Sequence, residues 1–78
     1  MIFLIQYDRM GGHLLRFEKY AYADRKRAKR DMLELDLKLN REGLNHEVVI
    51  LEAADEAAVR RTHRRYFETL EQLLTAPA

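Results

Sequence analysis

The sequence predicts one small α+β domain, residues 1–78, with element order ββαβα and a three-stranded, mainly antiparallel sheet. Strand-length apolar runs recur along the chain, and apolar residues at helical spacing separate and follow them. No Gly-rich or Pro-rich linker divides the 78 residues, so a single core is expected. The expected strands span about 2–8, 14–20 and 46–52, and the expected helices span about 24–42 and 55–74.

Residues 2–8 and 14–20 form the expected first hairpin. Both segments are rich in apolar and aromatic side chains, as strands are. The connecting residues 9–13 contain Gly11-Gly12, which supplies the positive φ angles that a tight reversal needs. The two segments are therefore predicted to pair as antiparallel strands.

The first helix is expected over residues 24–42. Asp24 is a suitable N-cap. Apolar residues then recur at helical spacing on one narrow face: Ala28, Met32, Leu35 and Leu39. Gly43 follows where a left-handed residue ends a helix, and Leu44 is placed to contact the last turn.

The third strand and the second helix complete the order of elements. Residues 46–52 contain Val48-Val49-Ile50-Leu51, a β-branched apolar run of strand length. Asp55 then caps a helix that is predicted to reach Leu74. Its apolar face comprises Val59, His63, Tyr66, Leu70 and Leu73, flanked by Phe67 and Leu74.

The connections predict the strand order. The second strand reaches the third through the first helix, and a right-handed crossover of this kind makes the two strands parallel. The apolar first strand can then lie between them and antiparallel to both, which gives the order 2-1-3. Charged residues fall on the edge strands, where they discourage pairing between molecules: Arg16, Glu18, Lys19, Glu47 and Glu52. We expect both helices on one face of this sheet, as in half of a ferredoxin-like sandwich.

The first strand is apolar on both faces, and two helices on one side can cover only one of them. An exposed apolar face usually marks an interface, and a small domain gains stability by association. With a hairpin loop of even length, the residues on the open face are Phe3, Ile5, Tyr7, Leu14 and Tyr20. A loop of odd length exchanges the two sets on the first strand.

Leu33 and Leu37 form a second apolar stripe, almost opposite the core face of the first helix. The stripe is consistent with contact to a partner or a second copy. It is equally consistent with packing by the second helix or with ordinary surface leucines. The candidate interface therefore comprises Phe3, Ile5, Tyr7, Leu14, Tyr20, Leu33 and Leu37.

Positive charge is concentrated in two helical segments, although 14 Lys and Arg against 13 Asp and Glu leave a net charge of only +1. The candidate nucleic-acid or anion contacts are Arg25, Lys26, Arg27, Lys29 and Arg30, joined by Arg60, Arg61, Arg64 and Arg65 if the two helix faces converge. Five positive charges near a helix N-terminus oppose the helix macrodipole, which favours a use for them. A solvated surface is the alternative, since i,i+4 ion pairs are available: Arg27–Asp31, Arg30–Glu34, Glu34–Lys38, Glu56–Arg60 and Arg64–Glu68.

The sequence contains few residues in the patterns that catalytic sites require. The chain has no Cys, Ser or Trp, which excludes disulfides, thiolate metal sites and Ser or Cys nucleophiles. His13, His46 and His63 fit no metal-ligand spacing, and His63 is expected at a core or boundary position. Glu47 and Glu52 lie on opposite strand faces, so they cannot form a close acid–base pair. We expect no enzymatic activity, no catalytic residues, no cofactor and no metal.

These observations predict a non-enzymatic, cytoplasmic domain that forms a homodimer or binds a protein partner. No apolar run is long enough to cross a membrane, and the N-terminal run lacks the basic residues of a signal peptide, so no membrane partner is expected. The alternative function is binding of RNA or single-stranded DNA through the basic clusters, with sheet aromatics able to stack on bases. Catalysis at a site shared by two subunits has only the three histidines to support it.

Overall fold

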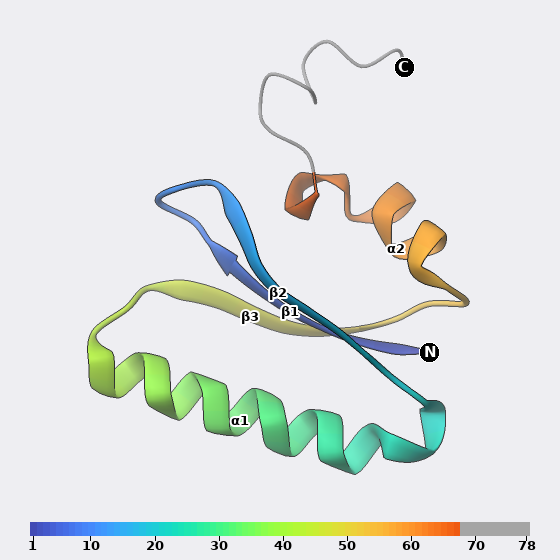
Figure 1. Ribbon diagram of the computed structural model, residues 1–78, viewed down its shortest axis with the longest axis horizontal. Coiled ribbons are helices and arrows are strands. Elements are labelled where there is room, and N and C mark those ends of the chain that lie inside the picture. Colours follow the sequence, from blue (N-terminus) through green and yellow to red (C-terminus); the bar gives the residue numbers. More distant parts are fainter. Residues whose placement is uncertain (68–78) are drawn as a thin grey trace, which may run out of the picture.

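The computed structural model describes residues 1–67. Its elements follow the predicted ββαβα order (Figure 1). They are β1 (Ile2–Asp8), β2 (His13–Tyr20), α1 (Arg25–Glu42), β3 (His46–Glu52) and α2 (Glu56–Thr62), with short 3-10 turns at Tyr22–Asp24 and Arg64–Tyr66. No helix in this described part of the chain is long and apolar enough to cross a membrane.

The sheet has the predicted order β2-β1-β3, and β1 is antiparallel to both neighbours. Because β1 is central, it contributes the most deeply buried side chains of the sheet. Ile2, Phe3, Leu4 and Ile5 are all fully buried, two on each face. The central strand therefore supplies two hydrophobic cores rather than one.

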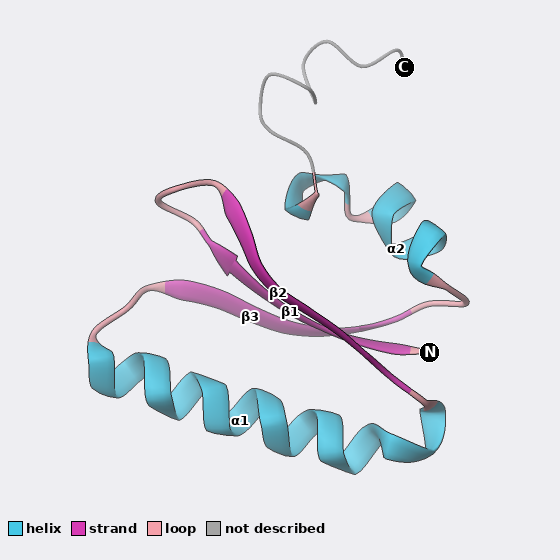
Figure 2. Ribbon diagram, viewed as in Figure 1, coloured by secondary structure: helices cyan, strands magenta, loops and turns pink. Residues whose placement is uncertain are grey.

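The two helices lie on opposite faces of the sheet, so the expectation that both cover one face is wrong (Figure 2). Helix α1 covers Ile2 and Leu4, packing Ala28 and Met32 against them. Helix α2 covers Phe3 and Ile5 with Val59. The reason lies in β1 itself, because a strand that is apolar on both faces buries more surface when each face has its own helix.

Helix α2 is much shorter than predicted, since it ends at Thr62 rather than reaching residue 74. His63, with φ −124° and ψ 50°, leaves the helical conformation, and a 3-10 turn follows it. The break brings Tyr66 into the core and sets the Phe67 ring edge-on to Phe17, with ring centres 5.3 Å apart. Tertiary packing thus overrides the helical spacing. Residues 68–74 of the predicted helix lie outside the described residues.

A bulge in the β1–β2 hairpin combines the two registers that the sequence left open. On the side of the bulge away from the turn, Ile5 lies opposite Phe17. On the side next to the turn, Tyr7 lies opposite Leu14. Leu14 and Phe17 consequently share the α2 face despite their odd spacing, and Leu15 is left exposed. Tyr20 moves to the α1 face, contrary to the even-loop assignment.

The turn and the helix ends are set by local hydrogen bonds. The Asp8 Oδ1 accepts from the backbone N–H groups of Met10 and Gly11, and Gly12 takes the left-handed φ of 70° that closes the turn. Helix α1 ends as predicted at Gly43, whose φ is 69°. Its N–H and that of the next residue donate to carbonyls of the last turn, at 3.2 and 3.0 Å.

The two predicted N-caps behave differently. The Asp55 Oδ1 accepts from the N–H of Ala58 at 2.8 Å, as an N-cap should. Asp24 occupies the N-cap position of α1 but makes no such bond. The preceding 3-10 turn has already bent the backbone at Asp24 to φ −98° and ψ 21°, so its side chain accepts from Arg27 instead.

Candidate functional site

The predicted open sheet face is covered in this structure. Phe3 and Ile5 are fully buried beneath α2, and Tyr7 and Leu14 are half-buried in the same cluster. Tyr20 is buried on the other face, next to α1. The expectation that these five residues form an exposed interface is therefore wrong, because α2 covers four of them and α1 covers Tyr20.

The second part of the predicted interface remains on the surface. Leu33 and Leu37 are 57 % and 53 % exposed, on the side of α1 that faces away from the sheet. Charged residues border this leucine pair: Lys29, Glu34, Asp36 and Arg41. None of these four makes an ion pair with another described residue. The leucine pair is thus an apolar strip between unpaired charges.

The basic cluster of α1 is partly neutralised. Arg25 pairs with Glu52, and Arg27 pairs with Asp24 at 3.4 Å. Arg30 lies 4.0 Å from its neighbour in sequence, Asp31. Lys26 and Lys29 are exposed and form no ion pair within residues 1–67.

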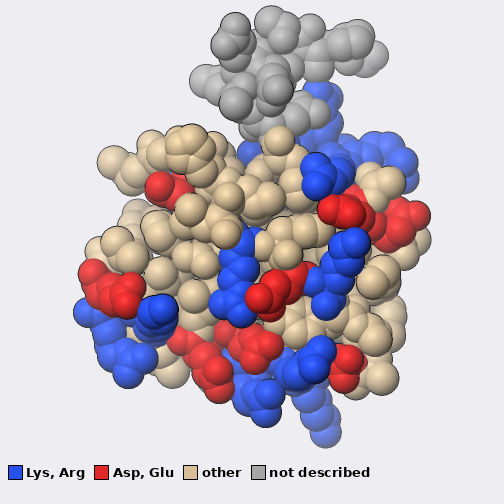
Figure 3. All heavy atoms as spheres, in the orientation of Figure 1, with Lys and Arg blue, Asp and Glu red and all other residues tan. Residues whose placement is uncertain are grey.

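The basic cluster of α2 lies over the opposite face of the sheet, so the two clusters do not converge on one surface (Figure 1). Arg60 pairs with Glu56 at 3.1 Å, the one predicted i,i+4 pair that forms among the described residues. Arg65 pairs with Glu47, and Arg61 is exposed. Arg64 lies in the adjoining 3-10 turn. Basic and acidic side chains are interleaved on the visible surface rather than separated into patches (Figure 3).

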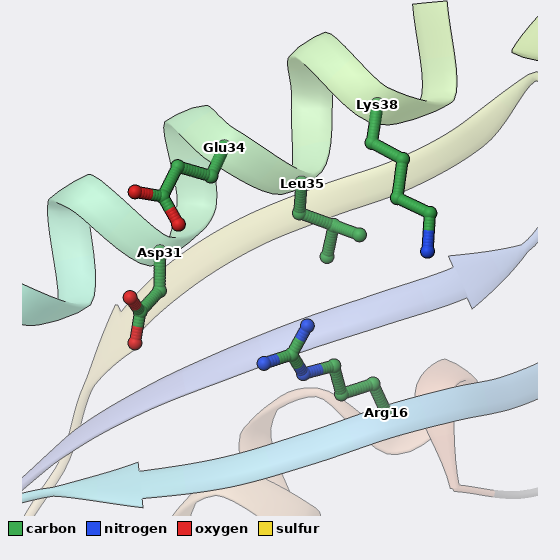
Figure 4. A pocket seen from close by; sticks show the side chains of 5 residues that line it. All are labelled: Arg16, Asp31, Glu34, Leu35 and Lys38. Carbon is green, nitrogen blue, oxygen red and sulfur yellow. The ribbon is translucent and has the colours of Figure 1, made fainter.

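A hollow between α1 and β2 is a concave site that sequence reasoning missed. Its volume is about 210 Å³, and its lining residues are Arg16, Asp31, Glu34, Leu35 and Lys38. Asp31, Glu34 and Lys38 project from α1, and Arg16 extends from β2 to meet them (Figure 4). We call this site the α1–β2 hollow. It brings two cations, two carboxylates and one apolar side chain around a single space.

A hydrogen-bonded network lies beside the hollow and includes two of its lining residues, Arg16 and Asp31. The Tyr20 hydroxyl lies 2.8 Å from Glu18 and 2.7 Å from Asp31, and the Arg16 Nε donates to Glu18 at 2.8 Å. The bond from Arg16 lowers the pKa of Glu18, with a further contribution from Tyr20. Burial raises the pKa of Tyr20, and both carboxylates raise it further. The hydroxyl therefore stays protonated, and its one proton can serve only one of two carboxylates.

A second network lies on the α2 face and is centred on Glu47. This carboxylate accepts from Arg9 at 3.3 Å, from Arg65 at 2.6 Å and from the Tyr66 hydroxyl. Burial raises the pKa of Glu47, but the hydrogen bonds from Tyr66 and Arg65 outweigh it and hold that pKa below 4.5. The same burial and contact raise the pKa of Tyr66 to about 12. Glu52 lies on the opposite face, where it accepts from Tyr22, as strand parity predicts.

The three histidines have different surroundings. His13 is exposed at the start of β2, and His46 contacts Gln6 through Nδ1 at 3.0 Å. His63 is half-buried at the end of α2, beside the Tyr66 ring. Within residues 1–67, no group of three or more His, Cys, Asp or Glu side chains could hold a metal ion.

Comparisons with protein-family models, with curated proteins and with solved structures found no match to this chain. Its function is therefore inferred from its own residues.

Proposed function

We propose that this protein is a non-enzymatic interaction module that self-associates by pairing α1 with α1 of a second copy. The observation that carries the proposal is the exposed pair Leu33 and Leu37, one helical turn apart on the outer side of α1. Burying both against the same pair of a second copy removes apolar surface from water on each helix. The sheet face is no longer available for this role, since α2 covers it.

The charges beside the leucines favour a parallel arrangement. In a heptad description, Leu33 and Leu37 occupy positions d and a. The g positions are then Lys29 and Asp36, and the e positions are Glu34 and Arg41. In a parallel pair each g residue faces the e residue five positions later on the other helix. Every such contact joins opposite charges: Lys29 to Glu34, and Asp36 to Arg41.

An antiparallel pair would bring like charges together. In that arrangement e faces e and g faces g, so Glu34 approaches Glu34 and Asp36 approaches Asp36 near the centre of the contact. Like charges at such positions are destabilising. The parallel contact cannot extend to the first half of α1, because Arg30 occupies the preceding a position. There it would face Arg30 of the second copy, which is a repulsive contact. We therefore expect the contact to be confined to the second half of α1 and to be weak.

Light scattering over a concentration series tests the proposal. From about 10 µM to about 1 mM, the unmodified protein should move from the monomer mass toward twice that mass. The variant Leu33→Lys/Leu37→Lys should stay monomeric throughout, while circular dichroism remains unchanged. Met10→Lys is the matched control, since Met10 is 89 % exposed on the hairpin and should leave association intact. A monomer at every concentration would exclude self-association.

Charge reversal tests the direction of the pairing. Asp36→Lys and Arg41→Asp should each weaken the dimer, because each creates two like-charge contacts in the parallel arrangement. The double variant restores opposite charges at both contacts and should recover most of the association. An additive loss in the double variant would show that these two positions do not face each other.

Nucleic-acid binding remains the alternative function, and it rests on the exposed Lys26, Lys29 and Arg61. Its test is fluorescence anisotropy with a labelled single-stranded oligonucleotide at low salt. Affinity that falls steeply with added salt and is reduced by Lys26→Gln/Arg61→Gln would move the function to the basic clusters. No binding at low salt would leave the interaction module as the single proposal. A cytoplasmic location is part of the same proposal and rests on composition, chiefly the absence of cysteine.

A further inference from the structure

The α1–β2 hollow carries a charge arrangement of which the self-association proposal uses only Glu34. Arg16 and Lys38 are positive, Asp31 and Glu34 are negative, and Leu35 adds an apolar side chain. The volume of about 210 Å³ is below the roughly 300–1,000 Å³ typical of drug-sized ligands. It equals the space of about seven liquid water molecules, which suits a small metabolite.

The charges that line the hollow are not paired with one another. Glu34 and Lys38 are four residues apart on α1, which is the spacing of a helical ion pair, but they form none. Arg16 uses its Nε on Glu18, and the other end of its guanidinium points toward α1 and Asp31 (Figure 4). Donors and acceptors therefore both remain available to a ligand.

Hydrogen bonding at Asp31 leaves a shortage of donors on the acidic side. The Tyr20 hydroxyl is within hydrogen-bond distance of Asp31 and of Glu18, yet it has one proton to donate. Arg16 supplies a second donor to Glu18, and Arg30 lies 4.0 Å from Asp31, too far for a good hydrogen bond. An ammonium group carries three N–H donors and would satisfy Asp31 directly.

We propose that the α1–β2 hollow binds a free α-amino acid with a small aliphatic side chain. The carboxylate would lie against Arg16 and Lys38, the ammonium group against Asp31 and Glu34, and the side chain on Leu35. A ligand with only one charge sign would be repelled by the half of the site that has the same sign. A molecule with adjacent positive and negative groups satisfies both halves, and an arginine fork suits a carboxylate.

An NMR titration with three related probes tests this proposal. L-leucine carries both charges, N-acetyl-L-leucine lacks the ammonium group, and L-leucinamide lacks the carboxylate. Saturable amide shifts confined to residues near Arg16, Leu35 and Lys38 are expected with L-leucine, and much weaker shifts with each of the other two probes. Equal binding of all three, or no saturable shift with L-leucine, would overturn the proposal.

Single substitutions separate the site from the surface around it. Lys38→Gln should weaken L-leucine binding about fivefold, the effect of one partly exposed charged contact. It should not weaken the binding of L-leucinamide, because that probe has no carboxylate for Lys38 to contact and its positive charge is repelled by Lys38. Lys26→Gln, on the same helix but outside the hollow, is the matched control and should change neither. Equal losses in both variants would contradict a defined site.

Binding in the hollow does not depend on self-association. The variant Leu33→Lys/Leu37→Lys keeps every lining residue, so its L-leucine titration should match that of the unmodified protein. If the monomeric variant still binds L-leucine, the result supports a binding site within one chain. Loss of binding together with loss of the dimer would overturn the assignment to one chain.

Discussion

The two faces of the sheet each hold a tyrosine bonded to carboxylate, and the two networks differ in their ratio of donors to acceptors. On the α2 face, one carboxylate, Glu47, receives bonds from Tyr66, Arg9 and Arg65. On the α1 face, Glu18 and Asp31 compete for one hydroxyl. The first network is closed, with its carboxylate only 12 % exposed, whereas the second opens into the α1–β2 hollow. The same side-chain chemistry can thus serve stability on one face and ligand binding on the other.

The largest expected effect tests whether α2 truly covers its face. Phe3→Ala should lower the free energy of unfolding by about 3–5 kcal/mol, because Phe3 is fully buried and stacks on Phe17. Urea denaturation measures the change. Phe3→Leu, a milder loss of volume, should cost about 1 kcal/mol and keeps the test usable if the alanine variant does not fold. A cost within about 0.5 kcal/mol for Phe3→Ala would mean that this face is open to solvent.

The next effect compares the two carboxylates directly. Glu47→Gln should destabilise the fold by about 1–2 kcal/mol, because three charged or polar donors lose their anionic acceptor. Glu18→Gln, at a side chain that is 40 % exposed, should cost less than about 1 kcal/mol. Denaturation of both variants at neutral pH measures the difference. Equal costs would remove the distinction between the closed and the open network.

Acid sensitivity should follow the same order. The pKa of Glu47 is lower in the folded protein than its ordinary value of 4.5, so the unfolded chain binds its proton first as pH falls. The stability that Glu47 contributes is therefore fully present above pH 4.5 and is lost as pH falls through the lowered pKa. Stability curves against pH should show a shallower acid loss for Glu47→Gln than for the unmodified protein. An unchanged slope would place the acid-sensitive group elsewhere.

The smallest expected effect concerns the two hydroxyls. Tyr66→Phe should cost about 1 kcal/mol, since Glu47 loses a buried donor. Tyr20→Phe should cost no more than about 0.5 kcal/mol, because Glu18 keeps its bond from Arg16 and both carboxylates are partly exposed, so that water can replace the hydroxyl. Thermal unfolding of the two variants under the same conditions measures the loss of stability in each. A larger cost for Tyr20→Phe would show that its network is as closed as that of Glu47.

Much of the fold could be predicted because local signals determined it. The strand segments, the order 2-1-3 and the end of α1 at Gly43 all follow from patterns within a few residues or from the handedness of one crossover. No handedness rule fixes α2, which follows the last strand. Its face was decided by burial of Phe3 and Ile5, and the apolar pattern of β1 on both faces was the signal that could have placed it.

The α1–β2 hollow could not be predicted because it depends on contacts between distant segments. Glu34 and Lys38 read as an ordinary helical ion pair in the sequence, and Arg16 reads as an edge-strand charge. Only the register of β2 beside β1 brings Arg16 under α1, and the hairpin bulge beyond it has no clear sequence signal. Similarly, the break at His63 follows from where Tyr66 packs rather than from any helix-ending residue.

The central place of β1 has a consequence for how the chain folds during synthesis. This strand precedes both of its neighbours in the chain, and β2 follows it after one short turn. Its other edge stays unpaired until β3 has emerged from the ribosome, and Phe3 and Ile5 stay uncovered until α2 has followed. The most apolar segment of the protein therefore stays partly exposed until β3 and α2 have been synthesised. For this reason we expect the nascent chain to aggregate more readily than the folded protein.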